Sequence, residues 1–369
     1  MRVVRGHDAV LGTACASCQL FCVLVVNTTK LAAERAGTWN LRRRAQHVAT
    51  HSQALVIGLL AVYVIGVAIF VPQILSWQTF RDVVIAMLPL VVAVIGQTFV
   101  LIVAGIDLSA TAVMGMGSVS AASIMTGTGG YLAGNALAVP AGIFAFLGVG
   151  FLVGVFNGIC AARLRMPSFI VTLATMMFVA GLAVWYTTFH SRSVSISNLP
   201  EPFRRIGYGT VLGVPIAFLL AVAIALVAHG VLSRTLLGRW LYAVGRNEKA
   251  ARTSGVPVER VVIAAFVISA ICAALAAIIY TSRVETGTPV LAQNLFLDII
   301  GAAVIGGVSL FGGRGTVMAA LMGVLFLTVL DKGLQLLGLS LFMVLAVKGS
   351  VILLAAVLDV ARQKWSGPR

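Results

Sequence analysis

The sequence predicts an all-α polytopic membrane protein with about ten transmembrane helices and both termini in the cytoplasm. Ten apolar stretches lie between residues 54 and 360, most of them about as long as the roughly 20 residues that span a hydrocarbon core. The composition is 60% hydrophobic and 10% charged, whereas soluble domains carry roughly 25% charged residues. Lys and Arg are also divided unequally between the segments that join the apolar stretches.

The apolar stretches are expected to be helices, because lipid offers no hydrogen-bond partner to an open backbone and the stretches lack the alternation of barrel strands. The predicted spans are residues 54–77, 82–104, 108–126, 136–161, 168–190, 210–233, 261–281, 298–311, 315–331 and 341–360.

The basic residues orient these spans. With the N-terminus inside, 19 of the 26 Lys and Arg residues lie in cytoplasmic segments and six on the opposite side, while Lys348 lies within the last span. Cells retain Lys and Arg preferentially on the cytoplasmic side of a membrane. The net charge of +15 therefore indicates membrane topology, and no nucleic acid partner is expected.

The chain is expected to divide into three regions. Residues 1–53 form a basic cytoplasmic extension, residues 54–361 the transmembrane domain, and residues 362–369 a cytoplasmic tail. Cys15, Cys18 and Cys22 lie close together in the first region but lack a second pair of ligands, so no metal site is expected.

Charged side chains at membrane depth are costly and are the first candidates for a function. Asp107, Asp298 and Lys348 occupy such positions, with Asp359 at the cytoplasmic edge. The Asp107 carboxylate either caps the next helix or borders a translocation path. Lys348 requires a partner in the bundle or a route to the membrane surface.

Several polar side chains inside the spans could bind a hydroxylated solute, or could instead join neighbouring helices. They are Gln97, Thr98, Asn157, Thr172 and Thr175.

Glycines at fixed spacing predict close helix packing in the fourth span. Gly150, Gly154 and Gly158 recur every four residues and share one helical face, which lets another helix approach closely. The eighth span is short and glycine-rich, a pattern also found in helices that line transport cavities.

The segment 234–260 is the largest cytoplasmic loop and predicts a short helix parallel to the membrane. Asn247 is a favourable N-cap and Glu248 suits the first turn, whereas Gly255 and Pro257 supply the stop. Such a helix is either a solvated connector or a lever docked on a partner.

Five segments together resemble one protein family. They are residues 105–109, 156–175, 238–255, 297–315 and the last helix with residues 347–349 and 358–359. The chain resembles the membrane permease subunits of bacterial ATP-binding-cassette (ABC) importers of the ribose type, which are related more distantly to branched-chain amino acid permeases. It departs from the family pattern at Ala104, Phe296 and the pair Asp331 and Lys332, where a glycine, an acid and two asparagines are usual.

This resemblance implies a permease in the bacterial inner membrane that imports a monosaccharide by alternating access. The sugar would be a ribose-like pentose, a hexose or a deoxysugar. The implied partners are ABC ATPase subunits, an extracellular or periplasmic sugar-binding protein and a second permease copy, in a homodimer or heterodimer. The sequence contains no G-x-x-x-x-G-K-[ST] phosphate loop, so we expect no enzyme activity or cofactor in this chain and assign ATP hydrolysis to a partner subunit.

The resemblance implies that the 234–260 loop couples the permease to its ATPase. The residues assigned to this coupling are Arg239, Arg246, Asn247, Glu248, Ala251, Arg252 and Gly255. The candidates for the translocation path are Gln97, Thr98, Asp107, Asn157, Thr172, Thr175 and Asp298.

Two outer segments, 191–209 and 282–297, are candidates for docking the binding protein through Arg204, Arg205, Arg283 and Glu285. The alternative function is an ion-coupled secondary transporter or a channel for a small polar solute, which would depend on Asp107 and Asp298.

Overall fold

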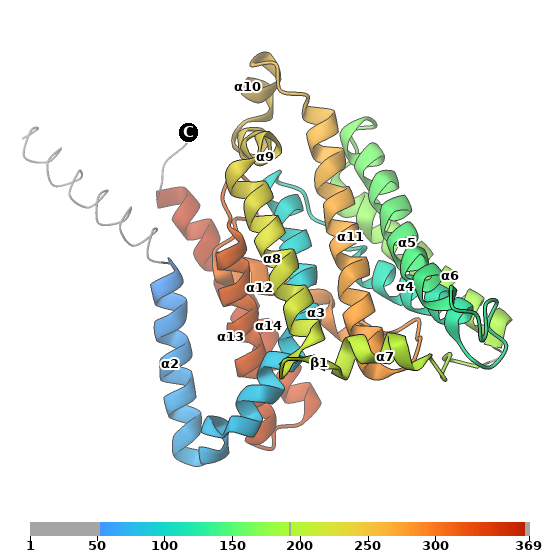
Figure 1. Ribbon diagram of the computed structural model, residues 1–369. Coiled ribbons are helices and arrows are strands. Elements are labelled where there is room, and N and C mark those ends of the chain that lie inside the picture. Colours follow the sequence, from blue (N-terminus) through green and yellow to red (C-terminus); the bar gives the residue numbers. More distant parts are fainter. Residues whose placement is uncertain (1–51, 192, 366–369) are drawn as a thin grey trace, which may run out of the picture. The chain divides into compact units, whose positions relative to one another are not determined.

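The computed structural model describes residues 52–191 and 193–365, and most of these are helical (Figure 1). Seven helices are long and apolar enough to cross a membrane, and three shorter apolar helices occupy the remaining predicted spans. The predicted all-α polytopic fold class is therefore confirmed. Residues 53–363 form one compact unit, whereas the extension predicted over 1–53 lies almost wholly outside the described residues. The cytoplasmic location of both termini stays a prediction.

The helices follow one another with short connections. Their bounds are α2 Ser52–Phe70, α3 Trp77–Ile102, α4 Ala110–Met125, α5 Ala138–Ala162, α6 Ser168–Ser191, α7 Glu201–Tyr208, α8 Ile216–Arg234, α9 Leu236–Arg246, α10 Glu248–Thr253, α11 Val258–Val284, α12 Phe296–Gly306, α13 Val317–Leu336 and α14 Leu341–Trp365, with 3-10 turns η1 Pro72–Leu75 and η2 Gln293–Leu295.

The first and sixth predicted spans differ most from the helices of the structure. The first ends at Phe70 rather than at residue 77, because Pro72 has no backbone N–H to continue α2 and begins η1 instead. The sixth begins at Ile216 rather than at residue 210. The residues before it form a two-stranded hairpin of β1 Thr210–Val211 and β2 Val214–Pro215.

Helix α11 occupies the centre of the bundle, where it packs against α3, α4 and α5. The predicted glycine face of α5 makes this contact. A Cβ atom added at Gly150 would lie 2.6 Å from the Ala270 carbonyl oxygen, and one added at Gly158 would lie 2.8 Å from the Ile263 Cα atom. The small residues therefore allow the α5 and α11 backbones to approach closely.

The bundle carries different structures at the two ends of α8. Helix α7 and the hairpin precede α8, whereas α9 and α10 follow it (Figure 1). A helix of 19 residues is roughly 28 Å long, which separates these two groups by about the thickness of a hydrocarbon core. They are therefore suited to contact partners on opposite sides of a membrane.

We expect Gly154→Val to destabilise the bundle by about 1–3 kcal/mol, the usual effect of overpacking. A Cβ at this position would lie 2.8 Å from the Val267 Cα atom and 3.0 Å from the Phe266 carbonyl oxygen. Gly148→Val is the matched control in the same helix, because a Cβ there meets nothing within 4 Å. Thermal unfolding in detergent measures both variants, and equal midpoints would contradict the packing role of the glycine face.

Candidate functional site

The Asp107 carboxylate is buried in the loop between α3 and α4, with the residue only 2% exposed. Its Oδ1 atom accepts hydrogen bonds from the Ser109 backbone N–H at 2.9 Å and from the Ser109 hydroxyl at 2.6 Å. Its Oδ2 atom accepts a hydrogen bond from the Ser269 hydroxyl of α11 at 2.8 Å. Within residues 52–191 and 193–365, no basic side chain forms an ion pair with this carboxylate.

The same cluster extends to three further helices. The Asn157 amide of α5 donates to the Ser109 hydroxyl at 2.8 Å and accepts from the Thr175 hydroxyl of α6 at 2.7 Å. With its amide oriented to match the surrounding donors and acceptors, Gln97 of α3 donates to the Asp107 carbonyl at 3.0 Å and accepts from the Asp107 N–H at 3.3 Å. We call these six residues the Asp107 network: Gln97, Asp107, Ser109, Asn157, Thr175 and Ser269.

The network contains four of the seven residues predicted for the translocation path. Of the other three, Thr172 lies beside it and donates to the Ile106 carbonyl at 3.1 Å. Thr98 donates to Val94 within its own helix. Asp298 lies elsewhere, against Lys348. The role of all seven in transport stays a prediction.

The Asp107 side chain closes its own loop and does not cap α4. It bonds Ser109, which directly precedes the helix, and no side chain caps the first turn of α4. Sequence reasoning missed Ser269, a serine in the apolar middle of α11, because nothing in its local pattern distinguishes it. Ala104 in the same loop adopts a left-handed backbone with φ of 60°, a conformation that favours the glycine usual in the family.

Lys348 has the buried partner that its depth requires. Its ammonium lies 2.7 Å from an Asp298 carboxylate oxygen and 3.6 Å from one of Asp331, and the Lys348 and Asp298 side chains are both less than 10% exposed. These contacts join α14 to α12 and α13. A second pair, Lys332 with Asp82 at 3.0 Å, is more exposed.

The short helix predicted within the 234–260 loop is confirmed as α10. The Asn247 side chain accepts a hydrogen bond from the Ala250 N–H at 3.0 Å, and Gly255 follows the helix with φ of +81°. Glu248 and Arg252 pair at 3.3 Å on the exposed face, while Ala251 is buried. Helix α10 therefore presents charged side chains outward and is anchored by a small apolar one.

Helix α9 precedes α10 and is missing from the sequence prediction. Its signals are the Thr235 hydroxyl, which accepts from the Gly238 N–H at 3.2 Å, and buried Leu241 and Val244 on one face. The predicted coupling residues Arg239 and Arg246 lie on its exposed surface. Apolar residues spaced by three and four positions could have revealed this amphipathic helix.

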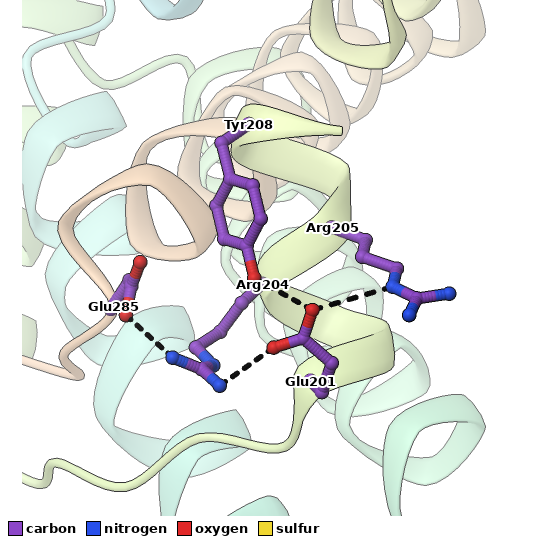
Figure 2. Close-up of polar contacts among 5 residues, drawn as sticks. All are labelled: Glu201, Arg204, Arg205, Tyr208 and Glu285. Atoms are coloured by element: carbon purple, nitrogen blue, oxygen red, sulfur yellow. Dashed lines mark hydrogen bonds and ion pairs between the residues drawn. The ribbon is translucent and has the colours of Figure 1, made fainter. Parts of the chain in front are cut away.

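At the other end of α8, the charged residues of α7 largely pair with one another (Figure 2). Arg204 lies 2.6 Å from Glu201 and 2.9 Å from Glu285, while Arg205 pairs with Glu201 at 3.3 Å. The Tyr208 hydroxyl donates to Glu201 at 2.8 Å. This hydrogen bond is the main reason that the pKa of Glu201 lies below its ordinary value, and the nearby Arg205 and Arg204 contribute further.

Comparison with known families identifies the chain. A family model described as the permease component of the branched-chain amino acid transport system matches residues 79–356. The chain belongs to this permease family. Together with the seven long apolar helices, this makes the permease a multi-pass protein of the bacterial inner membrane.

Three relatives illustrate the similarity of this permease to sugar permeases. The ribose import permease protein RbsC of Haemophilus influenzae is 35% identical over 72% of the chain and 80% of its own length. The L-arabinose transport system permease protein AraH of Escherichia coli is 35% identical over 82% and 89%. A probable ABC transporter permease of Sinorhizobium fredii is 33% identical over 90% and 97%. No solved structure matches the permease.

We expect Lys348→Met to destabilise the permease strongly, because it leaves the buried Asp298 carboxylate without a cation, typically at a cost of about 3–5 kcal/mol. The double variant Lys348→Met, Asp298→Asn should recover most of the loss. Lys332→Met is the control, since it breaks a more exposed pair worth about 0–1 kcal/mol. Thermal unfolding in detergent measures the series, and equal losses for the two single variants would contradict the buried pair.

We expect Tyr208→Phe to shift the acid sensitivity of the permease to higher pH. Because the pKa of Glu201 is lowered in the folded protein, its pairing contributes to stability above the ordinary carboxyl pKa and is lost as pH falls through the lowered value. Loss of the Tyr208 hydrogen bond moves that value back upward. Unfolding midpoints measured across acidic pH test this, with Tyr131→Phe as control, and coincident profiles for wild type and Tyr208→Phe would refute it.

Proposed function

We propose that this permease is the membrane subunit of an ABC importer that carries a monosaccharide into the cytoplasm. The observation that carries the proposal is 35% identity to ribose and arabinose permeases over 72% to 82% of the chain. The proposed sugars are ribose-like pentoses, hexoses and deoxysugars. Two permease copies, identical or different, would enclose the path and move it by alternating access.

We place the ATPase contact at α9 and α10. The exposed pair of Glu248 and Arg252 offers both charges to a partner, whereas buried Ala251 keeps α10 attached to the permease. ATP would be hydrolysed in the partner, and this chain would bind no cofactor of its own.

We place the binding-protein contact at α7 and the end of α11, on the opposite side of α8. Glu201 and Glu285 balance much of the charge of Arg204, and the Arg283 guanidinium donates to the Ile85 carbonyl at 2.8 Å. Arg205 has a 69% exposed side chain and is the most available of the predicted docking residues.

The first experiment is affinity purification of the tagged permease from its native membranes in mild detergent, followed by identification of bound proteins and an ATPase assay. A captured P-loop ATPase would support the importer. A permease that purifies alone and transports ribose in proteoliposomes without ATP would overturn it.

We expect the double variant Glu248→Ala, Arg252→Ala to weaken ATPase capture about tenfold, because charged residues at interfaces contribute about 1.4 kcal/mol or more when they are well paired. The control is Glu201→Ala, Arg205→Ala, which removes another exposed pair with the same helical spacing at the other end of α8. Both variants should insert into the membrane. Equal capture by the two variants would show that the ATPase does not bind at α10.

A further inference from the structure

The 307–316 loop between α12 and α13 contacts three other parts of the bundle at the end that carries α9. The Gly313 N–H donates to the Ile102 carbonyl at the end of α3, at 2.8 Å. The Tyr242 hydroxyl of α9 donates to the Gly315 carbonyl at 2.6 Å. An Asp359 carboxylate oxygen of α14 accepts from the Leu310 N–H at 3.2 Å.

The closest approach in this region is between α9, α3 and the loop, at Gly245. A Cβ atom added to Gly245 would overlap the Ile102 carbonyl oxygen and lie 2.6 Å from the Gly313 nitrogen. The Gly245 carbonyl oxygen in turn lies 2.9 Å from the position of a Cβ at Gly312. The backbones of α9, α3 and the loop thus meet without intervening side chains.

The loop conformation depends on its glycines. Gly312 and Gly313 have φ of +83° and +69°, which lie in the left-handed region that favours glycine. The Ser309 N–H also donates to the Arg314 carbonyl at 3.1 Å, which closes the loop on itself. Such a braced segment transmits a displacement better than a solvated linker would.

The Ile102 carbonyl leads directly into the Asp107 network. Ile102 ends α3, and the next residues form the loop in which Asp107 bonds Ser109 and Ser269. A movement of α9 at Gly245 would therefore displace the end of α3. Asp107 lies five residues further along the chain, and its carboxylate is hydrogen-bonded to α11.

We infer that the 307–316 loop transmits movement of α9 to the transmembrane helices, with Tyr242 and Gly245 as positioning residues for transport. The inference rests on the proposed ATPase contact at α9 and α10. It assigns the glycine-rich segment after α12 to the coupling machinery.

The test is Tyr242→Phe, which removes one hydroxyl bond to a backbone carbonyl and keeps the ring. Tyr63→Phe is the matched control, because the Tyr63 hydroxyl donates to the Leu330 carbonyl at 2.9 Å, away from α9. Each variant is reconstituted in proteoliposomes with its ATPase and binding protein, and ribose uptake and ATP hydrolysis are measured together. We expect Tyr242→Phe to lower the sugar imported per ATP about fivefold, as one lost hydrogen bond allows, while ATPase capture and the Tyr63→Phe ratio stay at the wild-type level.

A second variant tests the same contact sterically. Gly245→Ala should separate α9 from Ile102 and reduce the ratio further, whereas Gly230→Ala in α8 meets nothing within 4 Å and is its control. If the wild type captures no ATPase, the proposed function fails, and this inference fails with it. If the wild type couples and Tyr242→Phe matches Tyr63→Phe, only the present inference is overturned.

Discussion

The buried carboxylate of Asp107 is the constraint on which the arrangement of the bundle depends. An ionised or polar group inside an apolar bundle is costly unless its hydrogen bonds are satisfied. Here the carboxylate accepts from Ser109 in the loop and from Ser269 of α11. The network continues from Ser109 through Asn157 to α5 and α6, and the Asp107 backbone bonds Gln97 of α3. The Asp107 network therefore links four helices, and the glycine face of α5 lets α11 approach α5 closely.

The two ends of the permease use charge in different ways. Around α7 the acidic and basic residues mostly pair within the chain, whereas α10 presents its pair on an exposed helix anchored by Ala251. Backbone contacts at Gly245 and Gly313 then bring the α9 end against α3. The structure thus combines a hydrogen-bonded polar interior with two ends of different surface chemistry.

The sequence predicts features that are local and misses those that depend on distant contacts. Hydrophobic length locates the ten apolar helices, and capping chemistry locates α10 at Asn247. The pairing of Lys348 with Asp298 spans 50 residues, and local sequence holds no information on which carboxylate a buried lysine meets. Ser269 is hidden for the same reason, since its importance arises only where α11 crosses the Asp107 loop.

The distance along the chain between Asp107 and Ser269 also matters during synthesis. The two residues are 162 positions apart, which a ribosome adding about 5–20 residues per second covers in roughly 8–32 s. Of the described residues made before Ser269, Ser109 alone has a side chain that bonds this carboxylate in the folded structure. Helix α11 therefore supplies the second partner of the carboxylate late in synthesis, and the buried pair of Asp298 and Lys348 can form only after α14 has followed it.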